Sequence, residues 1–482
     1  MGAPFLSGSG AVWVQPDGPG TTKYYLGCHQ IDRVSRPRGG AALLHAPSVA
    51  RPGNYIPLAV YRTGNVSPVT FSIETDVEEA ADWLEFINCP VPIYVMLVDC
   101  GRMDVFANYA RAFILDNALI TQDELNGVAI RSPGDNRLMS QSFSIAARSV
   151  HRINRPTIVN QNASGTTGRT ASAICFCGPG RCHGSRGLAR SGCQEGFIGM
   201  EGQAAAASNV YVTHNGGHLW MPTDTNPFLD VESVRGVSCV QIGRNQWRVI
   251  AARGTADPAD PMEIAYSDDY GVTWTNADVG SVNGQYAIGR GDSMFAASHE
   301  NIWLVTTGGY IYYSGDSGAS WSAQESATIT SQDYYAVHFC DSLHGIVGGE
   351  RNIIVKTVSG GASWVAVSGP SDQAGIDILS LHMIDTDRWF ISYVDGRVWS
   401  TPDAGGDWLE CLYPDSGFGS VQSISFMNEY VGLIAHVDGA VGSIYRTIDG
   451  GDTWQLVDTS SVNAIYDVAM CDCNQYYVAG AF

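Results

Sequence analysis

The chain has no run of about 18 apolar residues, so we expect no transmembrane helix and no membrane insertion. Its start, MGAPFLSGSGAVWVQPDGPG, lacks a basic segment followed by an apolar one, and we expect no signal peptide. Cysteine is too sparse, at 12 in 482 residues, for a disulfide scaffold. No glycine-rich loop precedes a helix as a phosphate cradle requires, and no Ser–His–Asp nucleophile context is present.

Charged residues make up only 16% of the chain, and basic ones are scarcest in its second part. Residues 1–205 contain 17 Lys and Arg against 16 Asp and Glu, whereas residues 206–482 contain 10 against 32. The two parts therefore carry formal charges of +1 and −22. Because nucleic acids bind basic surfaces, the acidic part excludes a nucleic-acid partner. It favours solubility and repulsion between neighbouring copies.

Glycine is abundant, at 55 residues, and many glycines fall in a repeated eight-residue motif. The motif has a Ser or Thr first, an Asp third, a Gly fifth and a Trp eighth. Its six copies begin at Thr213, Ser267, Ser314, Thr357, Thr401 and Thr447, at spacings of 43 to 54 residues. A period in the forties with one turn motif per period predicts a repeat array with units the size of propeller blades.

The motif predicts a hairpin turn. A side-chain oxygen at the third position can accept backbone N–H groups of its own turn. The Gly permits a positive φ, and the Trp buries a large ring between sheets. The third positions are Asn215, Asp269, Asp316, Ser359, Asp403 and Asp449, and the eighth are Trp220, Trp274, Trp321, Trp364, Trp408 and Trp454. Asn215 and Ser359 depart from Asp, but a turn can tolerate both.

These segments resemble Asp-boxes, the BNR repeats of sialidase-type β-propellers. The resemblance covers about residues 206–482 and implies boxes on the C–D hairpins, away from the ligand face. An A–B strand pair follows each box, so the chain order begins with a C–D pair and ends with an A–B pair. We predict a six-bladed propeller closed by mixing N- and C-terminal strands in one blade, which leaves no long exposed edge. Six blades plus a loose half blade is the alternative.

The part before the propeller is also expected to be rich in strands, which makes the chain all-β. Residues 1–152 predict a β-sandwich or barrel with one amphipathic helix at Asp76–Phe86, which a capping box at Thr75 would begin. Residues 153–205 are rich in Gly, Ser and Ala, and we interpret them as a linker between this domain and the propeller at 206–482.

A cysteine cluster lies in the expected linker, at Cys175, Cys177, Cys182 and Cys193. Four thiolates could hold a structural zinc tetrahedrally. Two disulfides could equally staple a loop that has no core of its own. The spacing is not that of standard zinc-binding pairs, so both alternatives stay open, as do free thiols. No other cofactor is expected.

Charged residues on the expected B–C loops are the candidate ligand-binding groups, because propellers bind ligands on that face. They are Arg253, Glu350, Arg351, Asp395, Arg397 and Asp438. In the resembled family, enzymes grip a carboxylate with three arginines and use a Tyr–Glu nucleophile and an Asp acid/base. This chain has only His151-Arg-Ile-Asn-Arg-Pro156, which lacks the family's Arg-Ile-Pro core. We therefore predict no catalytic residues and no enzyme, with a sialidase-type glycoside hydrolase as the alternative.

The first 152 residues resemble the tail tube proteins of long-tailed phages in their layout, through WVQPDGPG, ETDVEEAADWLE and the strand-rich run from Pro92 to Ile145. The resemblance implies a hexameric ring or tube of identical chains, with the propeller outside as a decoration that binds surface glycans. The expected partners are further copies and other particle components, and the expected location is a virion or phage-like particle assembled in the host cytoplasm. A soluble assembly factor with an Asp-box propeller is a further alternative.

Overall fold

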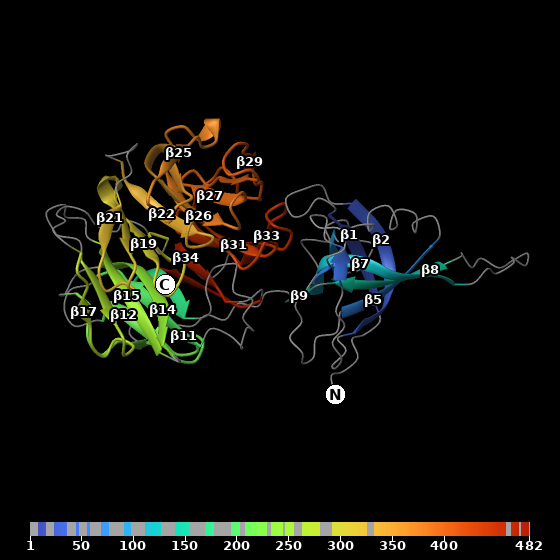
Figure 1. Ribbon diagram of the computed structural model, residues 1–482, viewed down its shortest axis with the longest axis horizontal. Helices are drawn as coiled ribbons and strands as arrows, with labels where there is room; N and C mark the ends of the chain where they lie inside the picture. Colours follow the sequence, from blue (N-terminus) through green and yellow to red (C-terminus); the bar gives the residue numbers. More distant parts are fainter. Residues whose placement is uncertain are drawn as a thin grey trace, which may run out of the picture. The chain divides into compact units, whose positions relative to one another are not determined.

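The structure is a computed structural model of the whole chain, which forms two compact units, Met1–Pro156 and Thr157–Phe482 (Figure 1). The described residues are 8–15, 24–35, 45–47, 55–57, 69–76, 91–97, 111–126, 140–147, 149–154, 169–177, 194–202, 208–228, 233–243, 246–254, 263–279, 292–324, 332–458, 464–471 and 474–481.

The first unit is a closed antiparallel barrel. Its sheet has the order β6-β1-β2-β5-β8-β7-β9, and a further pairing of β6 with β7 closes it. The strands are β1 (Gly8–Val14), β2 (Tyr24–Ser35), β5 (Val69–Asp76), β6 (Val91–Leu97), β7 (Arg111–Asn126), β8 (Ser140–Ala147) and β9 (Ser149–Asn154), and β3 (His45–Pro47) pairs with β4 (Tyr55–Pro57) apart from them. Val12, Val14 and Phe113 are buried. Of the predicted helix, Asp76 ends β5 and the rest lies outside the described residues.

The second unit is a propeller of six four-stranded antiparallel blades. The prediction of an all-β chain with a six-bladed propeller is therefore confirmed. Blade 1 is β10 (Ala171–Cys177), β11 (Glu195–Met200), β12 (Val210–Thr213) and β13 (Met221–Pro222); blade 2 is β14 (Ser233–Gly243), β15 (Gln246–Gly254), β16 (Ile264–Ser267) and β17 (Thr275–Asn276); blade 3 is β18 (Met294–Ala296), β19 (Ile302–Val305), β20 (Ile311–Ser314) and β21 (Ser322–Gln324).

The last three blades follow the same order of strands A to D. Blade 4 is β22 (Tyr334–Phe339), β23 (Gly345–Gly349), β24 (Ile354–Thr357) and β25 (Val365–Val367); blade 5 is β26 (Ile378–Met383), β27 (Trp389–Tyr393), β28 (Val398–Thr401) and β29 (Leu409–Glu410); blade 6 is β30 (Ser420–Phe426), β31 (Gly432–Asp438), β32 (Val441–Thr447) and β33 (Gln455–Asp458). Short 3-10 turns are η1 (Thr307–Gly309), η2 (Glu350–Asn352) and η3 (Ser371–Gln373).

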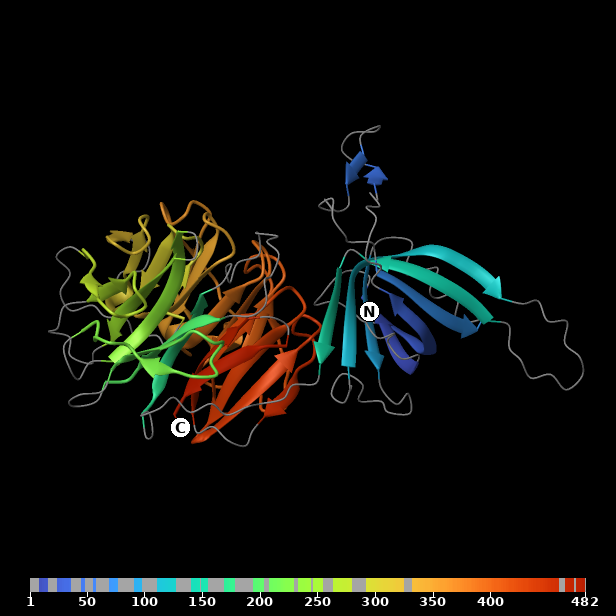
Figure 2. The ribbon, with the colours of Figure 1, turned by 90° about the horizontal axis from the view of Figure 1, so that it is seen from below.

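The predicted closure by strand mixing is wrong. The last strands, β34 (Ile465–Met470) and β35 (Tyr476–Gly480), form a two-stranded sheet of their own, here called the closing hairpin. It packs between blade 6 and blade 1 (Figure 1 and Figure 2). Blade 1 already has its own A and B strands, β10 and β11. The ring thus has six blades plus a half blade, but the half blade is packed into the ring and is not loose, as the alternative had it.

Strands β10 and β11 come from residues 153–205, the stretch predicted as a linker. Its small residues serve close packing. A Cβ built on Gly199 would lie 2.5 Å from the carbonyl oxygen of Val234 in blade 2. Ser172 Oγ donates a hydrogen bond to the same oxygen at 2.7 Å. Composition suggested a linker because close contact between blades demands the same small residues that loops contain.

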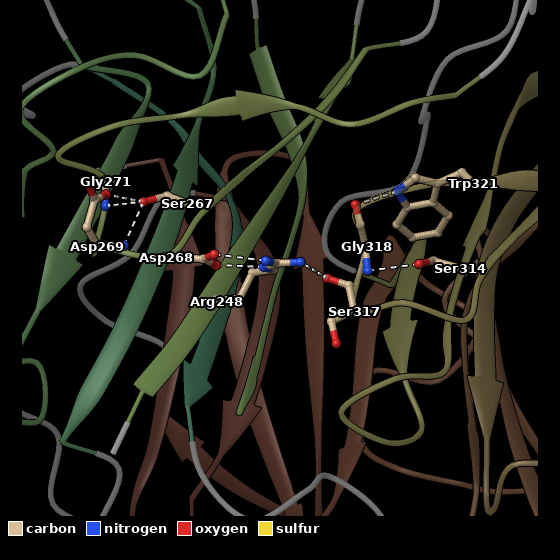
Figure 3. Close-up of polar contacts among 9 residues, drawn as sticks. All are labelled: Arg248, Ser267, Asp268, Asp269, Gly271, Ser314, Ser317, Gly318 and Trp321. Carbon is tan, nitrogen blue, oxygen red and sulfur yellow. Dashed lines mark hydrogen bonds and ion pairs between the residues drawn. The ribbon is translucent and has the colours of Figure 1, made fainter. Parts of the chain in front are cut away.

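Each of the six motif copies forms the turn between strands C and D of one blade. The first hydroxyl accepts the backbone N–H of the fifth residue, as between Ser267 and Gly271 at 2.8 Å (Figure 3). The third side chain accepts the N–H of the seventh residue. Asp316 does so from Ser320 at 2.9 Å, Asn215 from Leu219 at 2.9 Å and Ser359 from Ser363 at 3.1 Å. Asn and Ser therefore preserve the turn.

Neighbouring box turns are also joined across blades. Arg248 of β15 forms two hydrogen bonds with Asp268, at 2.6 and 2.8 Å, and donates a third to the carbonyl oxygen of Ser317 in the next box at 3.4 Å (Figure 3). Its guanidinium lies over the Tyr266 ring, 4.1 Å from the centroid. Arg248 and Asp268 thus help to hold blade 2 to blade 3.

The carboxylates of Asp269, Asp316 and Asp403 have pKa values below the usual range. Partial burial raises the pKa of Asp316, but hydrogen bonds from Ser320 and Ser314 outweigh it. At Asp403 the backbone N–H of Asp407 is the largest cause of the lowered pKa. Because the pKa is lower in the folded chain, each ionised carboxylate stabilises the fold at pH values above its unfolded pKa of about 4. This contribution is lost as the pH falls through the folded pKa.

We expect Asp316→Asn to weaken the acid sensitivity of the fold. The amide oxygen can accept the Ser320 N–H, as Asn215 does in blade 1, but it does not titrate. The free energy of unfolding should therefore fall less between about pH 5 and about pH 3 than in the wild type. Urea titrations followed by tryptophan fluorescence measure this, with Asp372→Asn, an exposed acid outside the boxes, as the control. An unchanged acid slope in Asp316→Asn would contradict the prediction.

Candidate functional site

The end of the blades opposite the boxes carries the candidate site. In a four-stranded meander, the B–C turn and the connection from strand D to the next strand A lie at one end, and the A–B and C–D turns lie at the other. We define the loop face as the B–C turns and D–A connections of blades 4 to 6, at residues 350–353, 368–377, 394–397, 411–419 and 438–440.

Five of the six predicted ligand-binding residues lie on the loop face. Arg253 does not: it lies in blade 2 on β15, is buried, and pairs with Glu263 at 3.4 Å. Glu350 and Arg351 pair with each other at 3.3 Å in η2. The backbone N–H of Arg351 is held by Asp377 at 2.9 Å. Asp438 is exposed at the end of β31.

Asp395 and Arg397 belong to one polar cluster on blade 5. Arg397 Nε lies 3.9 Å from Asp395 Oδ2 and 3.7 Å from Glu410 Oε1. The buried Gln373 amide, oriented to suit its neighbours, donates to Asp395 at 3.1 Å and accepts from Arg397 Nη1 at 3.1 Å. One guanidinium therefore faces two carboxylates and an amide, so its single charge offsets only part of the negative charge of this cluster.

The D–A connection between blades 5 and 6, residues 411–419, is fastened to the B–C turns on both sides. The Gly396 carbonyl oxygen accepts from Tyr413 Oη at 2.5 Å and from the Gly417 N–H at 3.3 Å. The buried His436 donates from Nε2 to the Phe418 carbonyl oxygen at 2.7 Å. A Cβ on Gly396, whose φ is +80°, would lie 1.9 Å from that same oxygen, so only glycine fits there.

The buried side chains of Tyr413 and Tyr445 help to hold this connection in place. Tyr445 Oη donates to Asp415, and the Tyr413 and Tyr445 rings lie 4.9 Å apart. Burial, and then the hydrogen bond to Asp415, raise the pKa of Tyr445. Burial also raises the pKa of Tyr413. A tyrosine nucleophile needs its phenol activated toward the phenolate, so a Tyr–carboxylate pair of this kind positions the loop and does not prepare attack on a glycoside.

Several residues of the loop face escaped the sequence prediction. Gln373, Tyr413, Asp415, Phe418 and His436 lie on D–A connections or on the strands below them. Those connections vary in length and carry no repeated motif. The available signal was Gly417-Phe418-Gly419, an aromatic residue between two glycines in the segment that joins two blades.

The predicted cysteine cluster is only partly described. Cys177 forms a disulfide with Cys239 of blade 2, a residue outside the predicted set, and Cys175 Sγ lies 3.6 Å from Cys239 Sγ. Cys182 and Cys193 lie outside the described residues. Within the described ranges, no three His, Cys, Asp or Glu residues are grouped as a metal site would need, and no helix is both long and apolar enough to cross a membrane.

The comparisons with known proteins concern the propeller. The family model of the photosynthesis system II assembly factor YCF48 matches residues 325–480, which include blades 4 to 6 and the closing hairpin. A curated relative, the photosystem II assembly lipoprotein Ycf48 of Synechococcus sp. (strain CC9902), is 26% identical over 141 residues. That match covers 29% of this chain and 41% of the relative, so the chain spans about two fifths of its length.

Three solved structures are similar to this chain over about two thirds of its length. A structure described as YCF48 bound to D1 peptide is 15% identical, with a TM-score of 0.48, and the match covers 68% of this chain and 95% of that one. YCF48 from Cyanidioschyzon merolae is 17% identical, with a TM-score of 0.46, over 65% and 94% of the two chains. A GH74 xyloglucanase from Xanthomonas campestris is 16% identical, with a TM-score of 0.49, over 67% and 52%.

These similarities overturn the predicted function. We predicted a component of a phage tail or phage-like particle that self-assembles into a ring, displays a glycan-binding decoration and is located in a virion. This prediction is wrong, because the matching family and the curated relative are photosystem II assembly factors. The tail tube resemblance of residues 1–152 is not shown. The expectation of a non-enzymatic protein is confirmed by the same two matches. Over residues 325–480 the chain is similar to the YCF48 family of assembly factors, the alternative that the repeats left open.

Proposed function

We propose that the chain is a non-catalytic assembly factor whose loop face holds a segment of a partner polypeptide. One observation carries the proposal: residues 325–480, which include both ends of blades 4 to 6, are similar to the assembly-factor family. The loop face is the end of these blades at which the box turns do not lie. Because the matched family and relative serve photosystem II, a subunit of that complex is the first partner to test.

The local structure supports binding to a preformed surface. The turns are held by side-chain bonds that do not depend on a ligand, such as Tyr393 Oη to Asn352 Oδ1 at 2.5 Å and Asn352 Nδ2 to the Pro370 carbonyl oxygen at 3.0 Å. A surface that is ordered before binding loses little conformational entropy on association. At the opposite end of the blades, the box side chains and Arg248 bond to the turns of the chain itself.

Site-specific photocrosslinking tests the proposal. We expect p-benzoylphenylalanine in place of Val394, on the loop face, to form an adduct with one defined polypeptide when the full chain is incubated with an extract of its source cells. The same group in place of Val358, an exposed valine in the box turn of blade 4, should form no such adduct and is the control. Mass spectrometry identifies the adduct.

Two results would overturn the assembly-factor proposal. One is a set of adducts that is identical at the two positions, because it would mean that the loop face has no preferred partner. The other is an adduct at Val394 that contains only further copies of this chain.

A further inference from the structure

The loop face carries a group of exposed apolar side chains at the junction of blades 5 and 6. Phe418 is 70% exposed and Leu412 69%, both on the 411–419 connection. Val394, in the neighbouring B–C turn of blade 5, is 45% exposed, and Val441, at the start of β32 in blade 6, is 52% exposed. We call these four residues the Phe418 patch. The Gly417–Gly396 and His436–Phe418 hydrogen bonds, with Val441 paired opposite Asp438, hold these segments next to one another. Exposed apolar residues on neighbouring segments mark interaction sites more often than scattered ones do.

Phe418 is exposed on a rigid segment. Its backbone N–H donates to the Asp415 carbonyl oxygen at 3.2 Å, and its own carbonyl oxygen accepts from buried His436. The next residue, Gly419, packs so closely on blade 6 that a Cβ there would lie 2.2 Å from the Val437 carbonyl oxygen. The backbone is therefore fixed on both sides of a ring that points to solvent. A rigid aromatic residue with few rotatable bonds is the kind of anchor that contributes most to binding free energy.

The charge around the patch has one predominant sign. Asp395 lies in the B–C turn of blade 5, Asp415 lies in the 411–419 connection with Phe418, and Asp438 ends β31. Glu410, at the end of β29, directly precedes the connection. The one arginine of these segments, Arg397, is already shared between Asp395 and Glu410. In neighbouring blade 4, burial and then the carboxylates of Asp377, Asp333 and Glu350 raise the pKa of Tyr335 to about 12. A partner must therefore bring positive charge to match this face.

We propose that the Phe418 patch binds a polypeptide segment in which apolar side chains alternate with Arg or Lys. The apolar groups would cover Phe418 and its neighbours, and the cations would pair with Asp395, Asp415 and Asp438. An arginine can also stack on the exposed face of the Phe418 ring. This inference rests on the proposed function and assigns the chemistry of the segment that the loop face holds.

Fluorescence anisotropy with synthetic peptides tests this inference. The probe is a fluorescein-labelled ten-residue peptide of alternating Leu and Arg, and its matched control has Glu in place of every Arg. We expect the full chain to bind the cationic probe and not the anionic one, and to bind more weakly as salt rises, because exposed charges are screened. Equal binding of both peptides, or no binding of the cationic one, would overturn the inference.

Variants then locate the site. Phe418→Ala should weaken binding of the cationic probe by about tenfold or more, as loss of an aromatic anchor does. Asp438→Lys should also weaken it, whereas Val358→Ala, at the opposite end, should not. Phe418 and Asp438 are exposed, so both variants should fold, and thermal unfolding verifies this. Equal affinity in Phe418→Ala and wild type would contradict the patch.

The two proposals can fail separately. If the photocrosslinker at Val394 captures a defined partner while the Leu–Arg probe does not bind, the assembly-factor proposal stands and the chemistry assigned to the segment is wrong. If the probe binds through Phe418 while the adducts show no preferred partner, the patch exists but the proposed function loses its support.

Discussion

Replacing Cys239 with Ala is expected to lower the free energy of unfolding of the propeller by about 4 kcal/mol, the value that the chain-entropy model predicts for a loop of this size. The disulfide joins Cys177 of β10 to Cys239 of β14 across 62 residues and so ties blade 1 to blade 2. The Cys177 side chain lies in a buried apolar cluster with Phe197, Val234 and Val249, and the partly buried Cys239 side chain packs against this cluster. Without the crosslink, the residues between Cys177 and Cys239 have more conformational freedom in the unfolded chain, and this lowers the free energy of unfolding.

Urea unfolding followed by tryptophan fluorescence measures this loss. The matched control is Cys340→Ala, which removes a buried thiol of blade 4 that is not in a disulfide and should cost much less. Reductant alone does not isolate the effect, since Cys471 is also in a disulfide. If Cys239→Ala and Cys340→Ala unfold at the same urea concentration, the Cys177–Cys239 crosslink does not stabilise the propeller.

Asp467→Ala should cost about 3 kcal/mol, because it removes a buried hydrogen-bonded side chain and leaves its donors without this acceptor. Asp467 lies on β34 in the closing hairpin and is completely buried. Its Oδ2 accepts the backbone N–H of Ile174 in blade 1 at 2.8 Å, and its Oδ1 accepts from Ser423 Oγ in blade 6 at 3.2 Å. One carboxylate therefore joins the two ends of the ring through the half blade.

Loss of this carboxylate should loosen the closure before it unfolds the rest of the propeller. Hydrogen exchange should become faster in β10, β34 and β35 of Asp467→Ala than in blades 3 and 4. Asp372→Ala, which removes an exposed carboxylate from a D–A connection, is the control and should leave the exchange pattern unchanged. Uniform acceleration over all blades would show that Asp467 does not act at the closure.

The loop face was predictable only in part. A charged residue expected near the end of strand B falls at the B–C end of its blade, and Asp395, Arg397 and Asp438 lie there, while their binding role stays a prediction. Arg253 satisfied the same rule but follows the alternation of β15 into the interior, where Glu263 pairs with it. Phe418 could not be found by spacing, because the connection that carries it is fixed by contacts with two other turns and not by a repeat.

The functional prediction was wrong because it depended on the general layout of the first 152 residues and not on a diagnostic motif. That layout shows strands and turns, which many unrelated folds share. The box repeats left an assembly factor as an alternative, and the similarity of residues 325–480 to such a family supports that alternative over a phage particle component.

By itself, the sequence determined the repeated part of this protein: an all-β chain with six box turns and therefore six blades. Each box closes its hydrogen bonds within eight residues, as from Thr447 to Trp454, so a contiguous segment contains all the information that the turn needs. Only the tertiary structure decided how the ring closes, which cysteine pairs with Cys177 and how Phe418 is held. These features join segments that are far apart in the chain, such as Ile174 and Asp467, and several pairings satisfy local preference equally well. Packing between blades selects one of them, because that pairing buries the apolar faces and still gives each buried polar group a partner.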